Sequence, residues 1–183
     1  NHGRMGKKGS LHPQNNWDFL LYAFLAERFR DEPRITFFIS TAPWMAYNLP
    51  KAPDFNHVIL HGDGIPNNLG IPWYGINRET AKLSDLLDMP IHFLHLGHFH
   101  QGAQLSKPYG TKIINGCLTG ASPYAVRNML GGLPMQFLWG LHPRIGKSWS
   151  YDIVLADRPS IQPDRNGIYT AHINGLSQMH QNG

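Results

Sequence analysis

The sequence predicts an α/β fold, and two observations carry that prediction. Short apolar runs rich in β-branched residues, at 57–61 and 91–96, are typical of buried strands. Residues 17–30 show the apolar spacing of an amphipathic helix, and residues 78–87 can form a second helix that ends before Pro90. At 183 residues, the expectation is one domain.

Each element is predicted from a local pattern and from the residues that end it. The first helix ends at Asp31-Glu32-Pro33. Residues 62–75 are rich in Gly, Pro and Asn, so a loop over the site is expected there. Strands are predicted at 35–40, 43–53 (an edge strand with a turn), 57–61, 91–96, 112–115, 135–139 and 149–155, and a short helix at 124–130. Polar composition from residue 157 onward divides the chain into a domain at 1–156 and a poorly packed tail at 157–183.

The most informative motif is Gly97-His98-Phe99-His100, which directly follows the apolar run 91–96. In an extended segment side chains alternate between faces, so His98 and His100 are expected to point to the same side. Two imidazoles at the carboxyl end of a buried strand suit zinc, manganese or iron. The alternative is a pair of polar loop residues.

Two other places strengthen the hypothesis of a metal site. His61 follows the apolar run 58–60 and precedes a glycine, and Asn1-His2 precedes Gly3. Loops after parallel strands converge at one edge of an open α/β sheet, where such folds bind their ligands.

In this order the three motifs resemble the C-terminal portion of the calcineurin-like metallophosphoesterases. The resemblance implies an α/β sandwich with αββα layers that lacks its N-terminal half. It implies two divalent ions (manganese, iron, zinc or nickel), with Asn1, His61 and His98 on one ion and His100 on the other. It further implies phosphoester hydrolysis by a bridging hydroxide, as in a phosphodiesterase or nuclease, with His2 as the catalytic residue that assists the leaving group.

The chain departs from the family pattern in its carboxylates. The family begins with Asp-x-His and then Gly-Asp-x-x-Asp, and this sequence contains no Asp-x-His. We therefore expect a missing N-terminal segment or a second chain to supply the aspartate ligands. Residues 62–78 resemble an insertion of phage and bacterial members of the superfamily.

Further site candidates have both a functional and a structural interpretation. Asp63 follows His61-Gly62 and can orient a ligand histidine, or simply form a turn. Arg4 can bind substrate phosphate through its planar guanidinium, or be an ordinary loop arginine. With Lys7 and Lys8 it forms a basic cluster that can attract nucleic acid, or a solvated loop. His92 and His95 are expected to be structural, with His95 facing away from the cluster.

Composition limits the class of protein. No apolar run reaches the length of a membrane span and no signal-peptide pattern opens the chain, so no membrane partner is expected. The single Cys117 excludes an internal disulfide and favours a cytoplasmic location. Three hypotheses remain: a metal-dependent phosphoesterase, a non-catalytic relative that binds a partner or nucleic acid, and a protein with one structural zinc.

Overall fold

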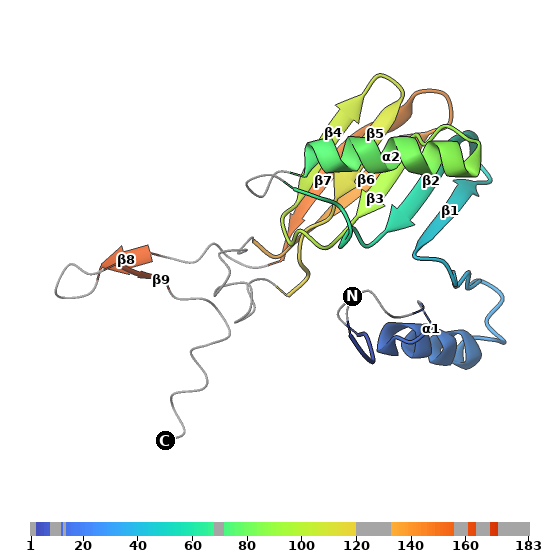
Figure 1. The fold of residues 1–183 in the computed structure, drawn as a ribbon, viewed down its shortest axis with the longest axis horizontal. Helices are drawn as coiled ribbons and strands as arrows, with labels where there is room; N and C mark the ends of the chain where they lie inside the picture. The colour runs from blue at the N-terminus through green and yellow to red at the C-terminus, as the bar shows by residue number, and fades with distance from the viewer. Residues whose placement is uncertain are drawn as a thin grey trace.

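The structure is a computed structural model that describes residues 3–7, 12, 14–67, 72–119, 133–155, 161–163 and 169–171. Its helices and strands are shown in Figure 1. In chain order they are α1 (Trp17–Arg28), β1 (Trp44–Leu49), β2 (Ala52–Leu60), α2 (Trp73–Leu87), β3 (Phe93–Leu96), β4 (Ala103–Lys107), β5 (Gly110–Ile114), β6 (Met135–His142), β7 (Gly146–Val154), β8 (Ile161–Pro163) and β9 (Tyr169–Ala171).

A five-stranded mixed sheet forms the centre of the molecule. Its strand order is β1-β2-β3-β5-β4; β2, β3 and β5 are parallel, and the edge strands β1 and β4 are antiparallel to their neighbours. Parallel strands are covered on both faces and therefore tend to be continuous apolar runs. The last three residues of β2, Val58 to Leu60, follow this pattern, and so does β3 except for His95. The mixed α/β fold predicted from the sequence is confirmed.

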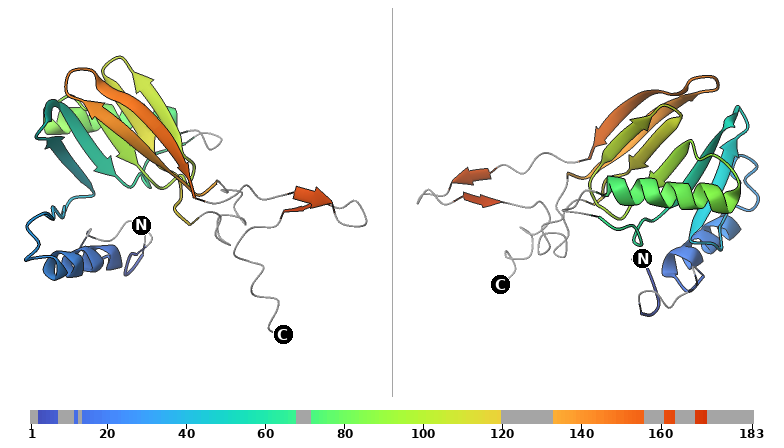
Figure 2. Two further views of the ribbon diagram at one scale, coloured as in Figure 1. Left: turned by 180° about the vertical axis from the view of Figure 1, so that it is seen from behind. Right: turned by 45° about the horizontal axis from the view of Figure 1, so that its top comes forward.

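The sheet has a different cover on each face. On one face α2 packs against an apolar core that includes Val58, Leu94 and Ile76. On the other face lies the β6–β7 hairpin, whose Trp139 stacks on Phe93 with ring centroids 5.2 Å apart. Figure 2 shows these layers from two further sides. The described residues therefore form helix, sheet and sheet layers, three of the four layers that the αββα prediction requires.

Helix α1 agrees with the sequence prediction and ends two residues earlier than expected. Asn16 caps its N-terminus, because the Asn16 side chain accepts a hydrogen bond from the Asp18 backbone N–H at 2.9 Å. None of its residues is buried, although most of them are apolar. Phe24 is 70% exposed. Figure 1 shows α1 apart from the five-stranded sheet. No helix of the described part is long and apolar enough to cross a membrane.

The strand predicted at 35–40 is wrong, because these residues have no regular structure. A strand needs a neighbouring backbone to complete its hydrogen bonds, and here the segment folds back along α1 instead, with Phe37 stacked on Phe29 at 6.4 Å. Its end is a turn, in which the Ser40 hydroxyl donates to the Trp44 carbonyl at 2.8 Å.

Other boundaries differ for local reasons. Helix α2 begins at Trp73 rather than 78, because Pro72 precedes it and Gly75 fits against the Pro66 carbonyl, where a Cβ would come within 2.1 Å. Strand β4 was not predicted, since its sequence is short and largely polar. The helix predicted at 124–130 lies outside the described residues. The division at 157 stays a prediction; beyond it, β8 and β9 form a two-stranded antiparallel sheet.

Candidate functional site

The predicted histidine ligands gather at the carboxyl edge of the central sheet. His61 directly follows β2, and His98 follows β3 after Gly97. The two strands are parallel and in register, with Leu60 opposite Leu96, so their ends lie side by side. A backbone hydrogen bond from the Gly97 N–H to the His61 carbonyl (3.2 Å) joins the two loops.

This joining brings two imidazoles together. The His61 Nε2 lies 3.3 Å from the His98 Nδ1. The centroids of the two rings are 5.1 Å apart and the ring planes meet at 72°, so the rings are arranged edge to face and are not stacked. Both side chains are half-buried. The prediction that His61 and His98 share one site is therefore consistent with the geometry. Both imidazoles are partly shielded by protein and partly open to solvent.

The backbone around His98 is not an extended strand. His98 and His100 have φ angles of 62° and 60°, in the left-handed region that non-glycine residues rarely adopt. A tight turn closes between them, with the Phe99 N–H donating to the Gly97 carbonyl at 2.7 Å. The expectation that strand alternation orients the two histidines is therefore wrong; a turn, not a pleat, sets their directions.

Left-handed residues cost roughly 1–3 kcal/mol each and persist only where their surroundings hold them. Here the loop is fixed on its far side, because the Asn115 N–H donates to the Leu96 carbonyl (2.7 Å) and the Cys117 N–H to the His100 carbonyl (3.4 Å). Two such residues in one four-residue turn are a sign of a functional constraint.

Asn115, directly after β5, connects the central sheet to the β6–β7 hairpin. Its side-chain Oδ1 accepts a hydrogen bond from the Phe137 backbone N–H at 3.0 Å, and its side-chain Nδ2 donates to the Gln136 Oε1. These bonds tie the end of β5 to β6, and so connect the site edge of the central sheet to the hairpin.

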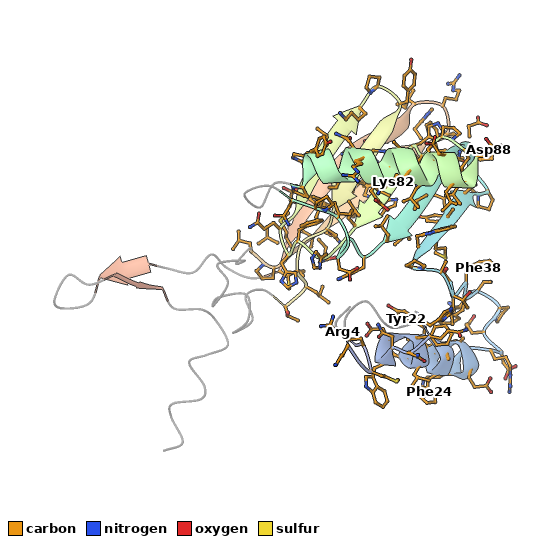
Figure 3. The ribbon with its side chains drawn as sticks, in the orientation of Figure 1. Arg4, Tyr22, Phe24, Phe38, Lys82 and Asp88 are labelled. Carbon is orange, nitrogen blue, oxygen red and sulfur yellow. The ribbon has the colours of Figure 1, made fainter. Side chains whose placement is uncertain are left out.

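The other predicted site residues are placed as follows. Asn1 and His2 lie outside the described residues. Asp63 is exposed in a turn closed by a hydrogen bond from the Ile65 N–H to the Gly62 carbonyl at 3.0 Å. Arg4 is exposed and forms an isolated β-bridge with Asn16, beside the start of α1 (Figure 3). Their predicted roles stay predictions. Among the described residues, no group of three or more His, Cys, Asp or Glu side chains is placed to hold a metal ion.

A hollow of about 410 Å³ lies between the site and α1. His61 lines it from the sheet side, and Asn16, Asp18 and Tyr22 line it from α1. Sequence reasoning assigned no site role to these α1 residues, because Asn16 has the ordinary signature of a helix cap. They place a carboxylate in the same hollow as His61.

No family model matches the sequence, and no curated relative matches it. By fold the chain is similar to crystal structures of Vps29 from Entamoeba histolytica. For wild-type Vps29 complexed with Zn²⁺ the TM-score is 0.40 at 16% identity, over 59% of this chain and 52% of that one. A single mutant and a double mutant give TM-scores of 0.41 at 16% and 15% identity, over 67% of this chain and 66% of theirs.

The chain thus spans about half to two thirds of the length of these structures. A partial likeness at this level assigns no function. The functional proposal therefore rests on the geometry of the two histidine loops.

Proposed function

We propose that His61 and His98 bind one divalent metal ion at the centre of a phosphoester hydrolase. The observation that carries the proposal is the 3.3 Å separation between the His61 Nε2 and the His98 Nδ1, at the sheet edge where α/β folds bind ligands. The left-handed φ angle of His98 supports it, because backbone strain of this kind collects at functional sites.

The donor atoms fit the ion. Two nitrogens that each lie about 2.0–2.1 Å from a tetrahedral zinc ion are roughly 3.3–3.4 Å apart. In the absence of metal, an N–H···N hydrogen bond between the two rings satisfies both nitrogens. In that hydrogen bond one of the two nitrogens carries the proton and is the donor. Neutral imidazoles are ligands for zinc and for the neighbouring divalent metals.

The remaining roles belong to the same proposal. Asn1 is a further ligand of the first ion, His100 contributes to a second ion, and aspartates from a missing segment or a second chain complete the two-metal centre. His2 is the residue that protonates the leaving oxygen, Arg4 binds the phosphoryl group, and Asp63 orients a ligand histidine. When bound, the ions supply Lewis-acid activation of water and neutralise charge on the phosphoryl oxygens. A basic cluster near Arg4 favours phosphodiesters, nucleic acid included, as the substrate class.

The test measures metal binding and turnover separately. Calorimetric titration with Zn²⁺ or Mn²⁺ is expected to show binding by the protein and a loss of at least tenfold in affinity for His61→Ala and for His98→Ala. Hydrolysis of bis-p-nitrophenyl phosphate with manganese is expected from the protein together with the segment or second chain that supplies the aspartate ligands, and not when that protein carries His98→Ala; this chain alone, without those aspartates, is expected to be inactive. The matched control is His142→Gln at the end of β6, a histidine that accepts a hydrogen bond from the Arg144 N–H and takes no part in the site.

Retained activity in His98→Ala would refute the enzyme proposal. Loss of metal binding in the His142→Gln control would show that the affinity does not come from the candidate site.

A second candidate is a non-catalytic relative, which holds a metal or a partner through the same scaffold without turnover. The observation in its favour is that the described residues bring together fewer than three metal-ligating side chains. Metal binding that depends on His61 and His98, without hydrolysis of any phosphoester tested, is the outcome that favours this candidate.

A further inference from the structure

A second pair of histidines lies on the face of the sheet that the β6–β7 hairpin covers, with His57 buried and His95 half-buried. The His57 Nδ1 lies 3.2 Å from the His95 Nε2, and the two rings are nearly parallel, at 5°. His57 has no exposed surface. Neither histidine belongs to the candidate metal site, which lies at the carboxyl end of the same two strands.

Aromatic rings enclose the pair. The His57 ring stacks between Tyr47 of β1 and Phe93 of β3, with centroid separations of 4.9 and 4.8 Å. Trp139 of β6 covers both histidines, at 5.7 Å from His95 and 6.0 Å from His57. The hairpin therefore closes over the two imidazoles with an indole ring.

The aromatic faces attract a cation weakly, but burial away from water and the neighbouring imidazoles oppose a positive charge on the pair more strongly. The His57 Nε2 is buried and has no hydrogen-bond partner among the described residues. Burial first, and the charge of His92 second, lower the pKa of His57 to about 4. Burial first, and the charge of His57 second, lower the pKa of His95 to about 4.

The titratable groups around the pair supply no close counter-charge. Tyr47 faces it from β1, and burial raises the pKa of that phenol. His92 lies before β3 and adds repulsion. On β7, Lys147 is hydrogen-bonded to Gln104 of β4, and Asp152 is exposed opposite Phe137. Lys112 of β5 is in register with Leu94, and its ammonium donates to the Ile91 carbonyl at 3.4 Å rather than to the pair.

We propose that the His57–His95 pair is an acid-sensitive latch, whose protonation releases the β6–β7 hairpin from the central sheet. The hairpin is the element that moves, because Trp139 closes over the pair and keeps out the water that a charged imidazole needs. The α2 face is expected to stay packed, since its core is formed by Val58, Ile76, Leu94 and other apolar side chains.

The sign of the pH dependence follows from proton uptake on opening. In the open hairpin the imidazoles return toward their ordinary pKa of about 6.5, so the open state binds more protons than the closed one. The latch is therefore fully closed above pH 6.5 and weakens as the pH falls toward 4. Each histidine shifts the opening equilibrium by up to about tenfold per pH unit in that window.

Hydrogen exchange followed by mass spectrometry tests the latch directly. Exchange is measured at pH 7.5 and pH 5.0 in the presence of EDTA, with rates corrected for the intrinsic pH dependence of amide exchange. Peptides covering residues 135–154 are expected to lose protection by at least tenfold at pH 5.0. Peptides covering α2 and β3 are expected to keep theirs. Equal loss throughout the sheet, or no loss in the hairpin, would overturn the proposal.

Two variants connect the response to the histidines. His57→Phe keeps an aromatic ring between Tyr47 and Phe93 but cannot be protonated, and His95→Gln keeps a polar side chain that does not titrate. Each is expected to reduce the pH dependence of hairpin protection, whereas the exposed control His12→Gln leaves it unchanged.

His98→Ala is expected to retain the full acid response, which separates the latch from the proposed metal site. If a variant does not fold, the pH dependence of urea unfolding of the unchanged protein still tests the latch. The expected slope between pH 6.5 and 4.5 corresponds to uptake of more than one proton on unfolding, and a flat profile contradicts the latch.

Discussion

At the scale of single residues, the left-handed histidine His98 links backbone strain to the proposed site. At φ 62° a residue other than glycine is strained, and strain at a loop that carries possible ligands supports a functional role for that loop. In the proposed site His98 contacts His61. His100 shares the left-handed conformation two residues later.

A comparison of His98→Gly with His98→Ala isolates the backbone contribution. Both variants lose the imidazole and are expected to lose metal affinity equally. Because only the glycine relieves the left-handed strain, His98→Gly is expected to be more stable than His98→Ala by about 1–2 kcal/mol. Urea unfolding without metal measures the difference. Equal stability of the two variants would mean that the turn is not strained.

Lys112 gives a second prediction at this scale, because its side chain is buried. Burial first, and the nearby Lys107 second, lower the pKa of Lys112 to about 8. Above the unfolded pKa of about 10.4 the lysine is neutral in both states, and its burial costs no charge desolvation. As the pH falls from about 10.4 to about 8 the unfolded state takes up a proton first, so the free energy of unfolding decreases.

Lys112→Met is therefore expected to stabilise the protein by roughly 1–3 kcal/mol at pH 7. The gain should shrink steadily between pH 8 and pH 10.5. Urea unfolding at several pH values measures it. The exposed Lys107→Met is the matched control and should change stability by less than about 0.5 kcal/mol. A gain that does not depend on pH would show that desolvation of the ammonium is not its cause.

The histidines show which part of the site the sequence could predict. Their place after buried strands predicted that His61 and His98 meet, since parallel strands end at the same edge. Their orientation could not be predicted, because a left-handed turn held by hydrogen bonds from Asn115 and Cys117 replaces the expected alternation. His95 was expected to be structural, and its contact with His57 depends on the register of β2 against β3, which the sequence does not show.

At the scale of elements, α2 shows how one helix holds a face of the sheet. It ends at Asp88, a left-handed residue at φ 49° that stands where glycine is usual. Its inner side carries Ile76 and Leu83, both buried in the core, while Leu86 is 69% exposed. Helix formation and sheet burial are thus coupled through a few apolar side chains.

Truncation on the two sides of α2 should have very different effects. Ile76→Ala removes a fully buried side chain and is expected to lower the free energy of unfolding by about 2–5 kcal/mol. Leu86→Ala on the exposed side should change it by less than about 0.5 kcal/mol. Thermal or urea unfolding compares the two variants. Similar losses for both would contradict the assignment of the inner face.

Elements with a strong apolar periodicity or a clear stop signal such as proline were predictable. Elements that depend on pairing with another strand were not. Helix α1 follows from its apolar spacing and its stop near Pro33. The run at 35–40 has the composition of a strand but no neighbour to pair with, whereas polar β4 is a strand only because β5 offers its backbone. Strand formation is a tertiary event, since its hydrogen bonds come from another segment.

At the scale of the whole molecule, the candidate site connects the ends of two adjacent strands, so the metal binding proposed there would be linked to folding. A ligand that binds only the folded state stabilises it by about 2.7 kcal/mol at one hundred times its dissociation constant. For a chain of this size, that corresponds to an increase in melting temperature of about 5–10 °C.

Zinc at that concentration is expected to raise the melting temperature of the protein by this amount and to leave His61→Ala unchanged. Differential scanning calorimetry with and without EDTA measures the shift. An equal shift in His61→Ala would locate the bound metal elsewhere in the chain.

The sequence by itself determined the α/β class, the helix α1, the buried strands β2 and β3, and the edge where His61 and His98 meet. These features follow from the local order of apolar and polar residues and from the rule that parallel strands end at the same edge of a sheet. Only the tertiary structure decided the left-handed turn at His98, the pairing of β4, and the covering of His57 and His95 by Trp139. Each of these depends on contacts between segments far apart in the chain, and no local pattern carries that information.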